Sequence, residues 1–274
     1  MLFLAAAAWA AAAGEEEIPL TKPVSKRFGF GQLTFRPGDR HLTILATPAS
    51  PPQQITIPFL AEGGEPREHA KLLVDDFTFD GAADLMVPSS TGYGGVNWFY
   101  VLYRYSRTAQ RLEPVKMDEE FCNPAADPVA KVLKVPCKSG PAWHDDAFQF
   151  TAGGVPFRHR ESSLVTLQGF PDDAEAAVYL IEYRDAGKKR LRSEVRDAED
   201  PARPAVRLIP AGRVYLHTSA NAKTRTGAYI VKGDRVELLD VTTEASGGAQ
   251  WLQVAYRSAR AGRLVRWICL SRAE

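Results

Sequence analysis

The residues with the clearest capacity for chemistry stand in one short segment, VDDFTFDGAADLMVP, from Val74 to Pro88. Oxygen-bearing side chains recur there at alternate positions, and Gly81, which permits a sharp bend, follows the third of them. A D-x-[DN]-x-D-G loop supplies oxygen ligands from alternate positions of one turn to a calcium ion, which prefers about six to eight of them. We therefore predict calcium as a cofactor, with Ala82 contributing its carbonyl oxygen and the following ligand set: Asp76, Thr78, Asp80, Ala82 and Asp84.

The alternative is an aspartate-rich turn without an ion, because aspartate side chains in turns also bond to their own backbone. An EF-hand is excluded, since Val87 stands at the twelfth loop position where that motif places a glutamate. The apolar segments AKLLVDDF and ADLMVP flank the cluster and are typical of strands rather than helices. The turn is therefore expected to join two strands.

The rest of the chain has the spacing of β-structure. Short apolar segments such as GQLTFRP, HLTILAT, QQITIPFL and the aromatic VNWFYVLYRYS are separated by Pro, Gly, Asp and Ser, and long helical periodicity is absent. This pattern predicts an all-β fold with an antiparallel, propeller-like or sandwich-like N-terminal domain. Four closely spaced strand candidates after Val206 predict a small barrel behind it.

The expected domain boundary is the segment DAEDPARPA, which carries charge and two prolines. We assign residues 15–198 to the β-rich domain, 199–205 to a linker and 206–274 to the second domain. From Ala205 onward the chain has 11 Lys and Arg against 5 Asp and Glu, whereas the remainder has 23 against 28. The basic end favours an anionic partner and the acidic front a cationic one.

The chain begins with an apolar run, Leu2–Ala13, that ends in small residues and is followed by acidic ones. Its length is typical of a signal peptide and too short for a membrane span, although no basic residue precedes it. We predict a signal peptide over residues 1–14 and a periplasmic or otherwise exported protein. The alternative is a buried or frayed N-terminal helix.

Export would allow a disulfide between Cys122 and Cys137, closing a loop of about 15 residues that is worth roughly 3 kcal/mol. Cys269 stands in the apolar segment RWICLS and is expected to be a small buried residue. No cysteine spacing resembles a zinc site.

The C-terminal segment RVYLHTSANAKTRTGAYIVKGDRVELLD, followed by WLQVAY and RLVRWICLS, resembles the bacterial SH3-like (SH3b) domain. The Gly233-Asp234 turn and the Trp251 strand match the family pattern, whereas Arg266-Trp267 replaces its closing Gly-Trp. The resemblance implies a small β-barrel of exported envelope proteins that binds wall peptide or another protein. A basic binding face is expected, against the alternative of a solvated surface, from these residues: Lys223, Arg225, Arg257, Arg260, Arg263 and Arg266.

The front domain more loosely resembles calcium-binding, β-propeller-like immunity proteins that neutralise wall-degrading toxins, and related periplasmic inhibitors of invertebrate-type lysozyme. The resemblance rests on QQITIPF, the aspartate motif with the aromatic strand after it, and the segment from FCNPAADP to CKSGPAWHDDAFQF. Thr78 replaces the usual Asn of the motif. In the inhibitors a protruding loop enters the enzyme cleft, which implies a partner-binding role for Ser90 and Tyr93 in SSTGYGG. The alternative is an ordinary flexible loop.

Together these patterns predict a non-enzymatic, exported envelope-binding protein, an inhibitor or immunity protein that acts on a wall-degrading enzyme. Neither nucleic-acid binding nor membrane spanning after signal cleavage is expected. The alternative is a peptidoglycan-binding or envelope-structural protein in which the SH3b domain does the binding. A third reading is a wall peptidase using Cys122 with His144, but the acidic surroundings in EEFCNP would raise the pKa of the Cys122 thiol and oppose its activation.

Overall fold

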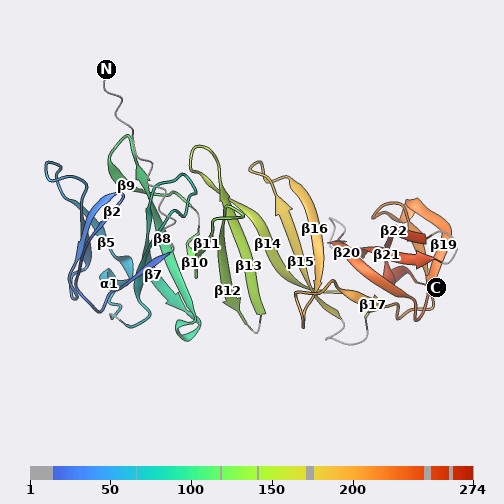
Figure 1. Cartoon of the computed structure of the whole chain (residues 1–274). Coiled ribbons are helices and arrows are strands. Elements are labelled where there is room, and N and C mark those ends of the chain that lie inside the picture. Colours follow the sequence, from blue (N-terminus) through green and yellow to red (C-terminus); the bar gives the residue numbers. More distant parts are fainter. Residues whose placement is uncertain are drawn as a thin grey trace, which may run out of the picture. The chain divides into compact units, whose positions relative to one another are not determined.

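The computed structural model describes residues 15–65, 67–117, 119–140, 142–170, 176–243, 248–258 and 262–273. Strands make up 58% and helices 6%, so the predicted all-β class is confirmed. The strands form four antiparallel sheets (Figure 1). The predicted signal peptide, residues 1–14, lies outside the described residues.

The first sheet is a four-stranded meander in chain order: β2 (Val24–Phe28), β3 (Gly31–Phe35), β4 (His41–Leu45) and β5 (Gln53–Thr56). Burial alternates along β3, where Leu33 and Phe35 are buried and the polar residues Gln32 and Thr34 are partly exposed. This period of two is what the segment GQLTFRP predicts, because successive side chains of a strand point to opposite faces.

The second sheet contains the aspartate turn and the aromatic strand. Its strands are β1 (Glu16–Pro19), β6 (Lys71–Asp75), β7 (Asp84–Gly92), β8 (Asn97–Ser106) and β10 (Phe121–Cys122), with β9 (Arg111–Pro114) paired to β8. A one-turn helix, α1 (Pro58–Ala61), precedes β6. Because Leu73 pairs with Met86 across β6 and β7, the aspartate segment is the turn between two neighbouring strands, as predicted.

The first two sheets bury one hydrophobic core. A fully buried side chain of this kind stabilises the fold by about 1.5–3 kcal/mol, so the core outweighs any single polar contact at the surface. The core includes these fully buried residues: Phe30, Leu33, Leu42, Ile57, Leu72, Phe77, Leu85 and Met86.

The third sheet runs in chain order: β11 (Ala125–Asp127), β12 (Val132–Ser139), β13 (Ala142–Phe150), β14 (Pro156–Thr166), β15 (Ala177–Arg184) and β16 (Arg190–Asp197). The fourth comprises β17 (Val206–Leu208), β18 (Arg213–His217), β19 (Arg225–Val231), β20 (Arg235–Thr243), β21 (Gln250–Ser258) and β22 (Gly262–Ile268). Two 3-10 turns, η2 (Ala222–Thr224) and η3 (Leu270–Arg272), accompany it.

The fourth sheet differs from the predicted barrel. Its strand order is β17-β20-β21-β22-β18-β19, so β17 and β19 form its two edges. No pairing joins these edges within the described residues, and the sheet stays open there. The strand positions themselves follow the segments that the sequence indicated, around a core that includes the fully buried Trp251.

By compactness the chain divides into two units, residues up to 143 with 147–157, and residues 144–146 with 158–274. The predicted linker, 199–205, lies within the second unit. There Ala205 is fully buried, its N–H donates to the carbonyl of Val195 at 3.1 Å, and its carbonyl accepts from Leu238 at 2.8 Å. The end of the segment at Ala205 is therefore packed, whereas residues 201–204 are exposed, and the position of the domain boundary stays a prediction.

No helix among the described residues is both long and apolar enough to cross a membrane.

The second unit contains a buried histidine, and we predict that it makes stability depend on pH. His217 is 6% exposed, lies edge-on to Trp251 with 4.9 Å between ring centroids, and donates through Nδ1 to the carbonyl of Asn221 at 3.1 Å. Burial lowers the pKa of His217 below its usual 6.5, with the nearby Arg225 and Arg272 acting in the same direction. The unfolded chain therefore takes up the proton more readily, so the contribution of His217 is present above about pH 6.5 and is lost as the pH falls below it.

Thermal melting of the full chain between pH 8 and pH 5 tests this. His217→Phe keeps a ring against Trp251 without a titrating group. We expect the melting temperature of the variant to fall less on acidification than that of the parent chain, since other titrating groups are common to both. Parallel curves for the two proteins would contradict a role for His217 in the pH dependence.

Candidate functional site

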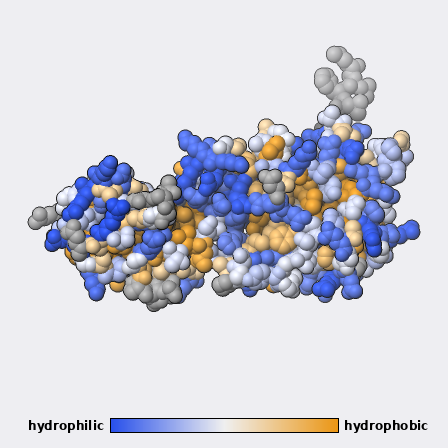
Figure 2. Space-filling view, turned by 180° about the vertical axis from the view of Figure 1, so that it is seen from behind, coloured by the Kyte–Doolittle hydropathy of each residue, from blue (hydrophilic) through white to orange (hydrophobic). Residues whose placement is uncertain are grey.

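The hairpin between β7 and β8 presents two exposed apolar side chains at its tip. A 3-10 turn, η1 (Tyr93–Gly95), closes the hairpin, with Tyr93 and both glycines at positive φ. Tyr93 is 50% exposed and Val96 44% exposed, whereas most aromatic side chains along β8 turn inward. On the face that Figure 2 shows, hydrophobic residues lie in separate patches among hydrophilic ones. We call Ser90 to Val96 the hairpin tip.

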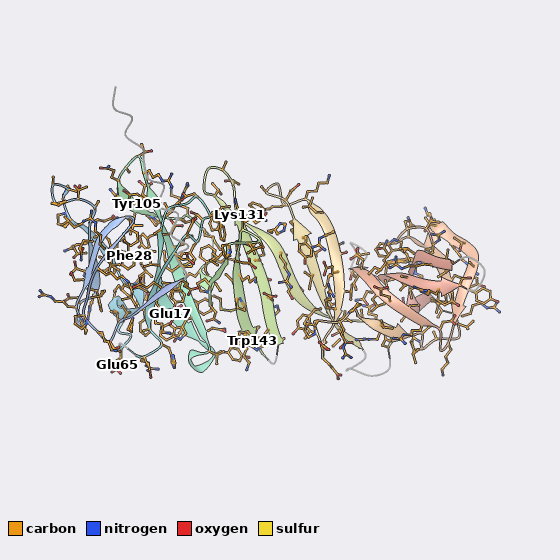
Figure 3. All side chains as sticks on the ribbon, viewed as in Figure 1. Glu17, Phe28, Glu65, Tyr105, Lys131 and Trp143 are labelled. Carbon is orange, nitrogen blue, oxygen red and sulfur yellow. A yellow bond between two sulfur atoms is a disulfide. The ribbon has the colours of Figure 1, made fainter. Side chains whose placement is uncertain are left out.

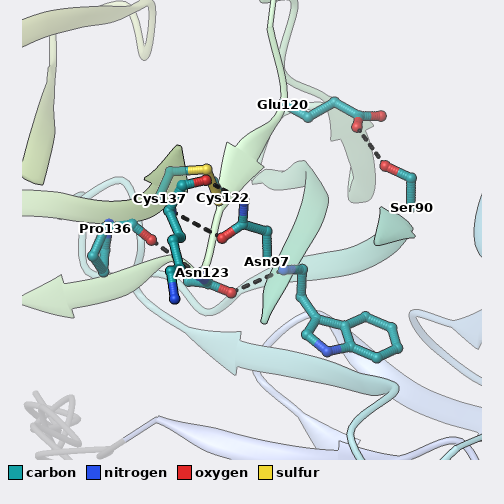
Figure 4. The surroundings of a disulfide bond; sticks show 9 residues. Ser90, Asn97, Glu120, Cys122, Asn123, Pro136 and Cys137 are labelled. Carbon is teal, nitrogen blue, oxygen red and sulfur yellow. Dashed lines mark hydrogen bonds between the residues drawn. A yellow bond between two sulfur atoms is a disulfide. The ribbon is translucent and has the colours of Figure 1, made fainter. Parts of the chain in front are cut away.

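Two asparagines fix the hairpin tip to the neighbouring segment (Figure 4). The Asn97 amide donates to the carbonyl of Lys138 at 2.9 Å and accepts from the Lys138 N–H at 3.0 Å. The side-chain oxygen of Asn123, Oδ1, accepts from the N–H of Trp98 at 2.9 Å, and the side-chain nitrogen, Nδ2, donates to the carbonyl of Pro136 at 3.0 Å. Because each amide bonds to main-chain atoms, these contacts set the position of the backbone as well as of the side chains.

The predicted disulfide is present and lies in the same place. Cys122 is bonded to Cys137, with 5.6 Å between their Cα atoms, and it immediately precedes Asn123. Cys122 pairs with Phe99 of β8 through the short strand β10. The covalent bond and the asparagine contacts therefore join the β7–β8 hairpin, directly beside its tip, to β12.

The side chains of the hairpin tip also have neighbours. The ammonium of Lys138 lies 5.8 Å from the centroid of the Tyr93 ring, within cation–π range. A Cβ placed on Gly140 would be 3.8 Å from the Tyr93 hydroxyl, so the end of the β12–β13 hairpin lies next to Tyr93. The Ser90 hydroxyl donates to Glu120 at 3.4 Å. Trp143, labelled in Figure 3, is the second residue of β13 and is 45% exposed.

The predicted calcium turn is closed by its own hydrogen bonds. The Asp76 carboxylate accepts from the N–H groups of Asp80 at 3.0 Å and Gly81 at 2.8 Å, and Asp80 accepts from Ala82 at 2.9 Å. Gly81 has a φ of 82°, which supplies the bend expected of it. Thr78 directs both its N–H and its hydroxyl to Asp84. The structure thus brings the predicted residues into one turn.

Asp84 occupies the innermost position and is fully buried. Its carboxylate accepts from the Thr78 N–H at 3.0 Å, the Thr78 hydroxyl at 2.9 Å and the N–H of Tyr105 at 3.1 Å. Burial raises the pKa of Asp84 to about 7, and these three donors lower it only in part. The sequence predicted proximity for Asp84 but not its contact with β8.

Arg104, which the sequence pattern did not single out, partly neutralises the negative charge of the aspartate turn. Arg104 of β8 bonds to Asp80 through Nε at 2.9 Å and through a terminal nitrogen at 2.7 Å. Within the described residues no group of three or more His, Cys, Asp or Glu side chains is placed to hold a metal ion. This arrangement fits the ion-free turn better than a preformed calcium site. Calcium binding stays a prediction, and it requires Asp80 to exchange Arg104 for the ion.

The predicted SH3b basic residues do not gather on one face. Arg257 and Arg263 stand opposite each other on β21 and β22, and Arg263 reaches Glu237 at 3.4 Å. Arg266 is three residues from Arg263 on the same strand, so alternation directs it to the other face. Arg260 lies outside the described residues.

The remaining basic residues belong to the β18–β19 hairpin. Lys223 is in η2, and the guanidinium carbon of Arg225 lies 3.3 Å from the centroid of the Tyr215 ring. Tyr215 pairs with Tyr229 across the strands, and Arg213 covers the Tyr229 ring at 4.5 Å. The structure therefore forms two adjacent tyrosine rings, each contacted by an arginine, where the sequence indicated only basic residues.

Asn97, Asn123 and Arg104 are the site residues that the sequence predictions missed. Asn123 lies in FCNPAADP, a segment that supported the family resemblance, and Asn97 begins the predicted aromatic strand. Neither pattern gave the asparagine itself a role. Their roles depend on partners that are 13 to 41 residues away along the chain, which local patterns do not reveal.

Comparison of the chain with protein-family models, with curated proteins and with solved structures finds no match.

We predict that the disulfide contributes about 3 kcal/mol to the free energy of unfolding, because its loop spans 15 residues. The double variant Cys122→Ala/Cys137→Ala should lose this amount in urea titration. Reductant should destabilise the parent chain by a similar amount and leave the double variant unchanged, which is the control. Equal stability of the parent chain and the double variant would contradict the prediction.

The calcium prediction is tested by melting the chain in EDTA and in millimolar calcium. A ligand that binds only the native state raises the melting temperature by mass action. We expect calcium to raise it in the parent chain, to raise it more in Arg104→Ala, where the competing cation is removed, and to have no effect in Asp80→Ala. Asp39→Ala, which removes an exposed carboxylate from another turn, is the control and should respond as the parent does. No calcium effect in any of these proteins would leave the ion-free turn as the correct reading.

Proposed function

We propose that this chain is an exported binding protein that docks a protein partner with its hairpin tip. The observation that carries the proposal is an exposed Tyr93 and Val96 on a hairpin that a disulfide and two asparagines hold in place. Binding by such a segment loses little conformational entropy, because its backbone is ordered before the partner arrives. An exposed tyrosine is also among the side chains that contribute most at protein interfaces.

A cationic partner fits the surroundings of the hairpin tip. A cavity of about 350 Å³ beside it is lined by Gly95, Trp98 and Tyr100 together with Glu15 and Glu17. Burial, and then the charges of Glu17 and Asp75, raise the pKa of Glu15. Lys71, which also lines the cavity and pairs with Glu17, acts in the opposite direction, so the two carboxylates outnumber the one lysine there. Aromatic walls and carboxylates together suit a lysine or arginine side chain.

The partner class that we propose is a cationic wall-degrading enzyme, in line with the resemblance of the aspartate motif and the aromatic strand to immunity and inhibitor proteins. The disulfide is compatible with export, because such bonds persist in oxidising compartments. The same bond leaves Cys122 without a thiol, so the peptidase reading based on Cys122 and His144 loses its nucleophile.

Inhibition of a muramidase tests the proposal, with an invertebrate-type lysozyme as the first enzyme. We expect the full chain to inhibit it and Tyr93→Ala to inhibit at least about tenfold more weakly, as for a central interface tyrosine. Tyr229→Ala is the matched control, since Tyr229 is 45% exposed but belongs to the second unit. Absence of inhibition by the parent chain, or an equal loss of inhibition in both variants, would contradict the proposal.

A further inference from the structure

A second cavity, of about 630 Å³, lies at the end of β8 opposite the hairpin tip. Its walls come from the ends of β8 and β9 and from the turn between β13 and β14, all within the first unit. Tyr105, labelled in Figure 3, is one of its lining residues. The volume is within the range of small-molecule sites, about 300–1,000 Å³. We call it the β8-end cavity.

The lining of the β8-end cavity is cationic although the front of the chain is acidic. Three cations, Arg104, Arg107 and Lys116, face two carboxylates, Asp80 and Glu113. Arg104 is committed to Asp80 and, through another nitrogen, to the carbonyl of Gly153 at 3.1 Å. It also lies across from Glu113 in the β8–β9 pairing, so its charge has two acidic neighbours.

Arg107 and Lys116 therefore supply the excess positive charge. Arg107 donates from one terminal nitrogen to the carbonyl of Asp80 at 3.2 Å, which orients the guanidinium and leaves further N–H groups for a ligand. Lys116 lies just beyond β9 and is exposed. An arginine and a lysine placed together in a hollow are the usual means of holding a carboxylate.

Apolar residues also line the β8-end cavity. Val155 is 60% exposed and lies next to Pro156, and Pro114 and Val115 line the cavity at and just beyond the end of β9. A ligand with a carboxylate alone would leave this surface exposed to water. The cationic and apolar residues of the lining together match a molecule with one anionic end and an apolar body.

We propose that the β8-end cavity binds a small amphipathic carboxylate, of the kind found at the carboxyl end of an apolar peptide. Arg107 and Lys116 hold the carboxylate, and Val155 and Val115 cover the adjoining apolar group. The site uses none of the residues of the hairpin tip and does not depend on docking there.

Isothermal titration of the full chain with N-acetyl-alanyl-valine, and with the same peptide carrying a C-terminal amide, tests the proposal. The two probes differ only in the anionic group, so the acid should bind at least about tenfold more tightly than the amide. The double variant Arg107→Ala/Lys116→Ala should lose at least about tenfold in affinity for the acid. Arg107 and Lys116 are both exposed, so the variant is expected to fold, and its melting curve is to be compared with that of the parent chain.

Lys22→Ala/Arg27→Ala is the matched control, since it removes one lysine and one arginine from exposed positions of the first unit outside the cavity. It should bind the acid as the parent chain does. Equal affinity for acid and amide, absence of binding by the parent chain, or unchanged binding by the Arg107→Ala/Lys116→Ala variant would each overturn the proposal.

Discussion

The hydrogen bonding of β8 at its two ends is the constraint on which both candidate surfaces depend. At one end the N–H of Trp98 donates to Asn123, and at the other the N–H of Tyr105 donates to the buried Asp84. Each of these side chains thus satisfies a backbone N–H at one end of the strand. The backbone beside the hairpin tip and the backbone at the β8-end cavity are therefore both held in place.

The crowding of like charges in the aspartate turn is relieved in a different way for each carboxylate. Asp76 accepts two backbone N–H groups, Asp80 pairs with Arg104, and burial raises the pKa of Asp84 to about 7, which favours its uncharged form. Repulsion alone therefore does not require a cation. A calcium ion would replace an arginine that already serves as the counter-charge, which makes Arg104 the residue that decides between the two states.

Local patterns predicted the elements well and their long-range contacts poorly. Alternation identified β3 and β8, the Gly81 bend lies where the motif needs it, and the cysteine pair formed as the spacing allowed. These features depend on neighbours along the chain. The partners of Arg104 and Asn97 are 24 and 41 residues away, and their meeting is decided by strand order. The proline-rich segment 199–205 has the composition of a linker, yet its last residue, Ala205, is buried and bonds on both sides.

The two candidate surfaces are expected to act independently. The ten residues of β8 rise by about 3.4 Å each, so its ends are about 30 Å apart. Changes separated by more than about 10 Å with no shared partner usually add in free energy. Arg104 bonds to Asp80 of the aspartate turn and to Gly153 of the cavity lining. Asn97 bonds instead to Lys138, beside the hairpin tip. A partner at one end of β8 and a small carboxylate at the other can therefore be bound together, and any coupling between them would have to pass through the strand itself.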